Sequence, residues 1–241
     1  MELWFLLVFC TIVFVAAVVQ GISGFAFVMV VLMVLPYYFG YTQALALSSL
    51  IYVVILYYNS YIYRKYIEWK WVPCWVIVFI ITDTIGVLVL KNVGDHPAWY
   101  ALMGIAFIVM SLYLLWGQQK ISFRPTLKKM MLFSGLCGIV TGFFAVGGPI
   151  MATFFLVAIN GKEKYLGTTQ IIGVFTMTID VFARAISGMY TIHLVKFACV
   201  GWIVAIVGIL VAKVLVGHLN EIIMKKCVCA VMIFSGITML V

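Results

Sequence analysis

Long apolar runs follow one another through nearly the whole chain of 241 residues. The sequence is 66% hydrophobic and 9% charged, whereas soluble domains carry about 25% charged residues. A transmembrane helix needs about 20 mainly apolar residues, and the runs cover residues 3–39, 44–63, 71–90, 98–117, 130–159, 166–188, 194–216 and 222–241. We therefore predict an all-α polytopic protein of the cell membrane, embedded in the lipid bilayer. Glu2 stands where a signal peptide has its basic region, so we expect the first run to be retained.

Glycine-rich interruptions occur in the first and fifth runs, which are too long for one span each. The fifth contains SGLCGIVTGFFAVGGPIMATFF at residues 134–155. In a helix interior glycine costs about 1 kcal/mol and proline about 3 kcal/mol. Split at its glycines, this run leaves two pieces of about 13 residues, fewer than the roughly 17 needed to cross. Broken backbone is tolerated in a membrane only where protein or a water-filled cavity surrounds it. We expect two re-entrant hairpins; two short crossing helices would give the same topology.

Basic residues gather in alternate loops. If each hairpin returns to its own side, one face carries Arg64, Lys65 and Lys70, then Lys120, Arg124, Lys128 and Lys129, then Lys162 and Lys164, and finally Lys225 and Lys226. The positive-inside rule places this face in the cytoplasm and both termini outside. The net charge of +8 is then a topology signal, and we expect no binding of nucleic acid.

The two halves of the sequence, residues 1–120 and 121–241, resemble each other. At spacings of about 120 residues, 24–27 (GFAF) matches 142–145 (GFFA), 46–48 matches 167–169, and 86–91 (GVLVLK) matches 208–213 (GILVAK). Each half holds one hairpin and three spans, an odd number of crossings, so the second copy is expected to be inverted. Inverted repeats with broken helices are typical of secondary transporters. Chance similarity between apolar segments is the alternative, and the common order of the matches favours the repeat.

The sequence resembles the TauE/SafE sulfite exporter family of membrane permeases. The resemblance rests on G-x-x-G-F at 21–25, GIVTGFFAVGGPI at 138–150 and GTT at 167–169, and it covers essentially the whole chain. It implies a secondary transporter that exports small sulfur-containing anions, such as sulfite or organosulfonates. The first half departs from the family pattern at Val28-Met29-Val30, where a glycine-rich run is expected. The resemblance therefore points to the second half for the substrate site.

Three ionisable residues, Asp83, Asp180 and Arg184, lie inside predicted spans. A charged residue there costs about 2.5–3.5 kcal/mol on insertion scales, which makes each a candidate for function. Steps of three and four residues place Thr169, Gly173, Thr176, Asp180 and Arg184 on one helical face. The helix related by the repeat carries a fainter stripe of Ser48, Tyr52, Ile55 and Asn59. We predict that Ser48, Asn59, Thr169, Thr176 and Arg184 line the substrate path.

The charged residues admit two interpretations. Asp180 and Arg184 can form a structural i,i+4 ion pair, or Asp180 can take up a proton and free Arg184 for an anion. Asp83 lies between two threonines with no obvious ionic partner. It can serve as a protonated hydrogen-bonding group or as a coupling residue. Asp83 and Asp180 are accordingly the candidates for proton coupling.

The hairpins offer a second way to hold an anion. Unpaired N–H groups at the start of an interrupted helix carry the positive end of its dipole and bind anions without a full charge. The predicted donors are Gln20, Ser23 and Gly24 in the first hairpin, and Ala145, Gly147 and Gly148 in the second. The alternative is that the glycines serve close helix packing, since G-x-x-x-G at 138–142 is an ordinary contact pattern.

Other functional classes have less support. The histidines lie singly and the cysteines form no C-x-x-C motif, so we expect no metal site and no cofactor. An intramembrane enzyme would need a dense cluster of acids, histidines or a nucleophile with its base, and an enzyme is not expected. A passive channel for small anions is the main alternative. No ATP-binding motif is present, so energy must come from an ion gradient or a partner. The sequence leaves the oligomeric state open.

Overall fold

The structure, a computed structural model, describes residues 3–93, 97–117, 123–144 and 147–215, together with positions 226, 229, 230, 233, 236 and 237. In chain order the elements are α1 (Leu3–Ser23), α2 (Phe27–Val31), α3 (Pro36–Phe39), α4 (Tyr41–Tyr63), η1 (Arg64–Tyr66), α5 (Val72–Val93), α6 (Pro97–Leu112), η2 (Tyr113–Gly117), α7 (Leu127–Phe144), α8 (Gly148–Ala158), α9 (Lys162–Ile186) and α10 (Ile192–Leu215). No strand occurs in these residues. The run predicted at 222–241 lies mostly outside them.

Six of the described helices are long and apolar enough to cross a membrane: α1, α4, α5, α7, α9 and α10. Their outward faces are apolar, as on α5, where Ile77, Ile81 and Ile85 are each more than half exposed. Successive steps of four place these side chains on one stripe, which suits contact with lipid rather than water. The predicted all-α, multi-pass membrane architecture is confirmed. The predicted span at 98–117 is less regular, because α6 ends at Leu112 and continues as the π-helical turn η2.

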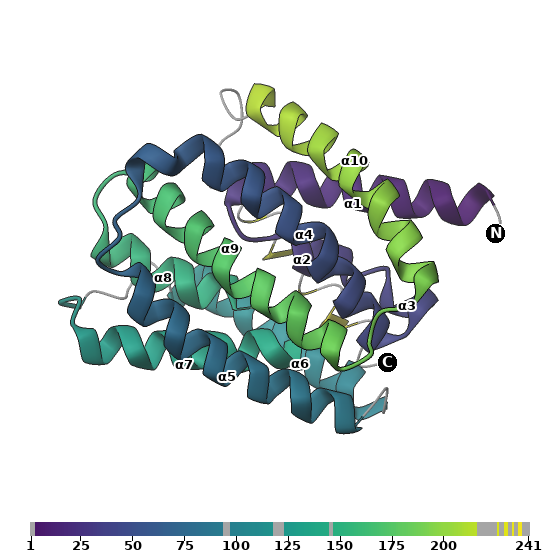
Figure 1. Cartoon of the computed structure of the whole chain (residues 1–241), viewed down its shortest axis with the longest axis horizontal. Coiled ribbons are helices and arrows are strands. Elements are labelled where there is room, and N and C mark those ends of the chain that lie inside the picture. The colour runs from purple at the N-terminus through teal and green to yellow at the C-terminus, as the bar shows by residue number, and fades with distance from the viewer. Residues whose placement is uncertain are drawn as a thin grey trace.

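Two central helices, α4 and α9, pack on each other and run side by side across the middle of the molecule (Figure 1). Around them α1 packs on α10, and α7 packs on α5. The central pair also reaches outward, because α4 contacts α10 and α9 contacts α5. Short segments fill the space beside the centre, where α2 lies against α4 and α8 against α9. Segments from both interrupted runs therefore reach the centre of the molecule.

Both long runs are interrupted. In the first, α1 ends at Ser23, and Gly24 takes the left-handed conformation with φ of 85°, which glycine adopts without strain. In the second, α7 ends at Phe144 and α8 begins at Gly148, with Gly147 as its N-cap residue and Pro149 in its first turn. Proline is favoured in this position because its missing N–H would be unpaired there in any case. The predicted interruption within residues 134–155 is confirmed.

The predicted lengths of the pieces are wrong. α7 has 18 residues and α1 has 21, so each is long enough to be a candidate span, and only the returning arms are short. The glycines at 135, 138 and 142 lie inside α7 rather than at its break. Those at 138 and 142 are tolerated because α7 packs closely on α5: a Cβ atom at Gly142 would lie 2.6 Å from the Asp83 carbonyl oxygen and 3.0 Å from the Gly86 Cα. Here the packing interpretation of the G-x-x-x-G pattern is confirmed.

This contact predicts unequal effects for two glycine substitutions on one helix. Gly142→Ala should destabilise the protein, because overpacking against fixed backbone typically costs about 1–3 kcal/mol. Gly135→Ala is the matched control, since its Cβ would meet nothing closer than the Val78 Cγ1 at 3.8 Å and alanine favours helix. Thermal unfolding in detergent measures both. Equal melting temperatures for the two variants would contradict the close approach of α5 and α7.

Candidate functional site

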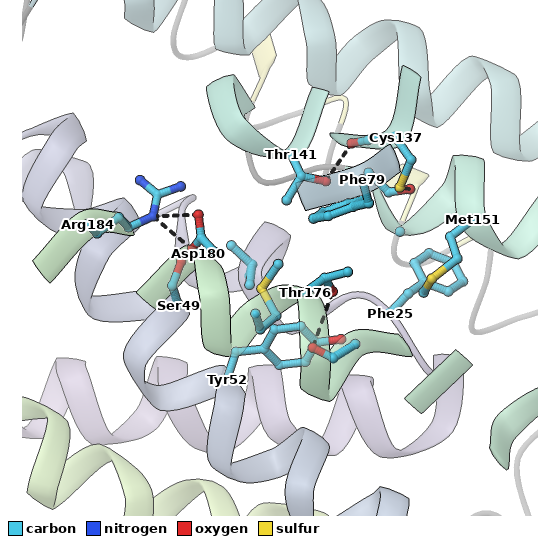
Figure 2. A pocket seen from close by; sticks show the side chains of 15 residues that line it. Phe25, Ser49, Tyr52, Phe79, Cys137, Thr141, Met151, Thr176, Asp180 and Arg184 are labelled. Carbon is cyan, nitrogen blue, oxygen red and sulfur yellow. Dashed lines mark hydrogen bonds and ion pairs between the residues drawn. The ribbon is translucent and has the colours of Figure 1, made fainter. Parts of the chain in front are cut away.

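A buried cavity of about 50 Å³ lies where the two breaks, α4, α5 and α9 converge (Figure 2). A water molecule needs about 10–15 Å³ measured in this way, so the cavity has room for more than one. Its walls are formed by Phe25 and Val28 from the first hairpin, Ser49 and Tyr52 from α4, Phe79 from α5, Cys137, Thr141, Gly147, Gly148 and Met151 from the second hairpin, and Gly173, Thr176, Met177, Asp180 and Arg184 from α9. Both halves of the chain contribute to it.

The two broken segments touch beside this cavity. A Cβ atom at Gly148 would lie 2.8 Å from the Phe25 Cβ and 3.2 Å from the Phe25 carbonyl oxygen, so only glycine permits this approach. Gly147 and Gly148, two of the predicted donors, line the cavity. Gly24 does not; its carbonyl oxygen accepts a hydrogen bond of 3.2 Å from the Gln170 amide. Ala145 and the Ser23 side chain lie outside the described residues.

An ion pair on α9 forms one wall. The Arg184 Nε lies 2.8 and 3.0 Å from the two carboxylate oxygens of Asp180, and both side chains are almost fully buried. In Figure 2 the Asp180 carboxylate lies beside Nε, on the side toward the other labelled residues. The Arg184 Nη1 and Nη2 atoms are buried and have no hydrogen-bond partner among the described residues. Burying such donors unpaired is costly, so Arg184 retains two strong sites for an oxyanion.

The threonines near the cavity offer fewer donors than the sequence suggested. Thr176 donates its hydroxyl hydrogen to its own helix, at 3.0 Å from the Ile172 carbonyl oxygen. Thr141 does the same toward the Cys137 carbonyl oxygen, at 2.7 Å. Thr169 is buried outside the cavity wall and bonds to the Tyr165 carbonyl oxygen. In this arrangement the threonine oxygens can accept hydrogen bonds, but their hydrogens are already used.

Helix α4 turns a different face to the cavity from the one predicted. Ser49 and Tyr52 line it, whereas Ser48 and Asn59 are buried elsewhere. Ser48 donates to the Leu45 carbonyl oxygen at 2.9 Å. Tyr52 belongs to the stripe recognised in the sequence but was not among the predicted site residues. Its position on that stripe, as a polar aromatic residue, was the sequence feature that could have identified it as a site residue.

The orientation of Tyr52 is fixed by Gln20 from α1. The Gln20 Oε1 accepts a hydrogen bond of 3.0 Å from the Phe27 backbone N–H, and its Nε2 donates to the Tyr52 hydroxyl at 3.2 Å. Gln20 therefore uses its amide within the protein and does not line the cavity. Because the Tyr52 oxygen accepts from Gln20, its own hydrogen is free to donate to a molecule in the cavity.

Asp83 lies on α5, outside the cavity wall, and is fully buried. Its Oδ1 has no hydrogen-bond partner among the described residues. The carboxyl group is near enough to Asp180 and Arg184 for their charges to interact. The three ionisable residues, which the sequence places on two different spans, therefore lie near one another in the interior. No group of three or more histidine, cysteine or acidic residues suited to a metal occurs in the described part of the chain.

Six apolar spans around a central cavity at two broken helices are typical of polytopic membrane permeases. Within this class, the sequence model of the sulfite exporter TauE/SafE family matches residues 9–239, and the protein belongs to this family. The members of this family are membrane permeases that export sulfite and related anions. They are transporters rather than enzymes. The resemblance found in the sequence is confirmed. Neither the curated proteins nor the solved structures compared with the chain gave a match.

The buried ion pair makes a prediction for stability. Arg184→Gln leaves the Asp180 carboxylate without its cation, and removing one partner of a buried pair typically costs about 3–5 kcal/mol. The double variant Asp180→Asn with Arg184→Gln should recover most of the loss, because two neutral amides can bond to each other. Melting temperatures in detergent measure both effects. A single variant as stable as the parent protein would contradict a desolvated pair.

Proposed function

We propose that the protein is a secondary transporter that exports a small sulfur oxyanion, either sulfite or an organosulfonate, by alternating access around the cavity between the two hairpins. One observation carries this proposal: Arg184 belongs to the cavity wall, and its buried Nη1 and Nη2 groups have no hydrogen-bond partner among the described residues. A planar guanidinium with free Nη atoms matches the oxygens of a sulfur oxyanion in geometry and charge. The family match supports the class of substrate and the direction.

The packing of the helices supports two inverted repeats, residues 1–120 and 121–241. Exchanging the halves converts the α1–α10 contact into the α7–α5 contact, and the α4–α10 contact into the α9–α5 contact. The central α4–α9 contact is converted into itself. This is the pattern that a two-fold axis through the centre produces, and the cavity lies where such an axis would pass. Rocking of the two halves about this region would expose the cavity to each side in turn.

The proposed site combines three kinds of donor. Arg184 supplies charge, and Tyr52 supplies a hydroxyl hydrogen. Gly148, the first residue of α8, supplies a backbone N–H that no helix carbonyl can reach. Because Asp180 neutralises Arg184, the empty site carries no net charge from this pair, so an anion is held by directed hydrogen bonds. Weak net attraction suits a substrate that must be released on the other side.

The orientation is proposed from the basic loops. Glu68 connects two of them: its carboxylate lies 3.5 Å from the Lys70 Nζ and 3.3 Å from the Lys164 Nζ, and its backbone N–H donates to Thr168. The loop with Arg64 and the start of α9 therefore lie at the same end of the molecule, and the N-terminus lies at the other end in Figure 1. The positive-inside rule makes the basic end cytoplasmic and the termini external.

Counterflow in proteoliposomes tests the function. Labelled sulfite outside should enter faster when the vesicles hold unlabelled sulfite, and the rate should saturate. The double variant Asp180→Asn with Arg184→Gln, which keeps the fold, should raise the half-saturation concentration about tenfold or more, since a hydrogen bond to a charged group contributes about 1.5–3 kcal/mol. Arg64→Gln, the same change on the exposed loop, should behave as the parent.

The outcomes separate the alternatives. Flux that never saturates and shows no counterflow would identify a channel. A stable double variant with unaltered sulfite transport would reduce the Asp180–Arg184 pair to a structural role and leave the hairpin backbone as the anion site.

Tyr52 makes a separate prediction. Tyr52→Phe removes one neutral donor and should raise the half-saturation concentration for sulfite about three- to tenfold, because such a bond contributes about 0.5–1.5 kcal/mol. Tyr57→Phe is the matched control: it lies on the same helix, and its exposed hydroxyl bonds to Thr178 at 3.2 Å. The same counterflow assay measures both variants. Equal half-saturation constants would remove Tyr52 from the site.

A further inference from the structure

Four buried polar atoms without a hydrogen-bond partner among the described residues lie on three parts of the chain. They are the Asp83 Oδ1 on α5, the Arg184 Nη1 and Nη2 on α9, and the Tyr190 hydroxyl on the segment after α9. Buried polar groups in folded proteins are nearly always paired. Asp83, Arg184 and Tyr190 are also close enough for electrostatic interaction with one another or with Asp180. Their grouping in one region indicates a site with more than one state.

Only one of the titratable and charged groups that face Asp83 is a cation. Helix α5 packs on α7 and α9. Asp180 and Arg184 face Asp83 from α9, and the Cys137 thiol faces it from α7; the Tyr190 hydroxyl interacts with Asp180 and Arg184 at the same cluster. Among these groups Arg184 is the only cation, and its Nε already belongs to Asp180. An ionised Asp83 and a bound anion would therefore compete for the same two Nη atoms.

We propose that Asp83 carries a proton that is cotransported with the anion, one proton for each anion; this inference rests on the proposed function. When Asp83 is ionised, its carboxylate takes the Arg184 Nη atoms and the anion cannot bind. When Asp83 accepts a proton from the water on the side to which the cavity opens, the Nη atoms are released to the anion. On the other side the anion leaves and the proton returns to water.

The buried charge is the same in both states. Asp180 and Arg184 cancel, and the remaining single negative charge belongs either to Asp83 or to a monovalent anion. Placing an additional charge in a low-dielectric interior is expensive. A proton taken up with each anion avoids this cost, and it allows both the loaded and the empty carrier to change conformation. For a monovalent anion the complete cycle is electroneutral, so export requires an outward gradient of the anion that exceeds any inward gradient of protons.

Asp83 suits this role better than Asp180. Both oxygens of Asp180 lie within hydrogen-bond distance of the Arg184 Nε, at 2.8 and 3.0 Å. Hydrogen bonds to the ionised form stabilise that form, so protonating Asp180 would sacrifice an existing interaction. The Asp83 Oδ1 has no such bond to lose. Of the two coupling candidates from the sequence, the geometry favours Asp83.

The experiment uses methanesulfonate as the anion, because it stays monovalent near neutral pH and cannot itself carry a proton. Proteoliposomes of the full chain contain a pH-sensitive dye, and potassium with valinomycin holds the membrane potential at zero. One proton should enter with each methanesulfonate. A gradient of one pH unit, acid outside, should then drive about tenfold accumulation, since one unit is a tenfold difference in proton activity.

The variants locate the proton. Asp83→Asn, which resembles the protonated form, should continue counterflow at a rate independent of pH, with no proton movement and no accumulation. Asp83→Glu keeps a carboxyl group and should retain coupling, which covers the case in which the asparagine variant does not fold. Glu68→Gln removes a carboxylate from the cytoplasmic loop and is the matched control, with coupling as in the parent.

The two proposals fail in different ways. Parent protein that exchanges methanesulfonate but moves no proton would overturn the coupling and leave the transport function standing. Proton-coupled accumulation that survives Asp83→Asn would overturn the assignment to Asp83. Parent protein that exchanges neither sulfite nor methanesulfonate would overturn the transport function, and the coupling with it.

Discussion

A broken helix inside a membrane must have its free backbone groups satisfied by protein, because hydrocarbon offers no hydrogen bonds. The structure meets this constraint with side chains from distant parts of the chain. Gln20 accepts from the Phe27 N–H, Gln170 donates to the Gly24 carbonyl oxygen, and the Cys137 thiol donates to the Gly147 carbonyl oxygen at 3.2 Å. Breaks held in this way must lie within reach of several helices, and this requirement brings both of them to the centre of the molecule.

The same requirement explains where the cavity lies. Two interrupted helices cannot pack as tightly as continuous ones. The space left between them is bounded by α4 and α9, and these two are the most buried of the candidate spans. A cation in this position is tolerated because Asp180 lies one helical turn away on the same helix. The pair leaves two guanidinium nitrogens unused. The ion pair that makes the buried Arg184 tolerable therefore also leaves the two Nη groups on which the proposed site depends.

The two hairpins are related in outline but differ in chemistry. In the first, Gln20 occupies the start of the short helix α2 and links it to Tyr52. In the second, Gly147 is the N-cap residue of α8 and makes no side-chain cap, and a Cβ atom there would lie 2.7 Å from the Cys137 carbonyl oxygen. One break is thus closed by a side chain, whereas the other keeps its backbone beside the cavity. This asymmetry agrees with the departure of the first half from the family pattern at Val28-Met29-Val30.

The sequence by itself determined the features that depend on local spacing: the apolar spans, the two interrupted runs, and the Asp180–Arg184 pair at i,i+4. The tertiary structure decided which glycines break a helix and which only permit contact. A glycine costs a helix about 1 kcal/mol, which is small enough for close packing on α5 to offset at Gly142. The tertiary structure also decided that α4 presents Tyr52 to the cavity, and that Asp83 lies near enough to the ion pair on α9 to interact with its charges. Those outcomes depend on how helices rotate and pack against each other, and a periodic sequence pattern does not contain that information.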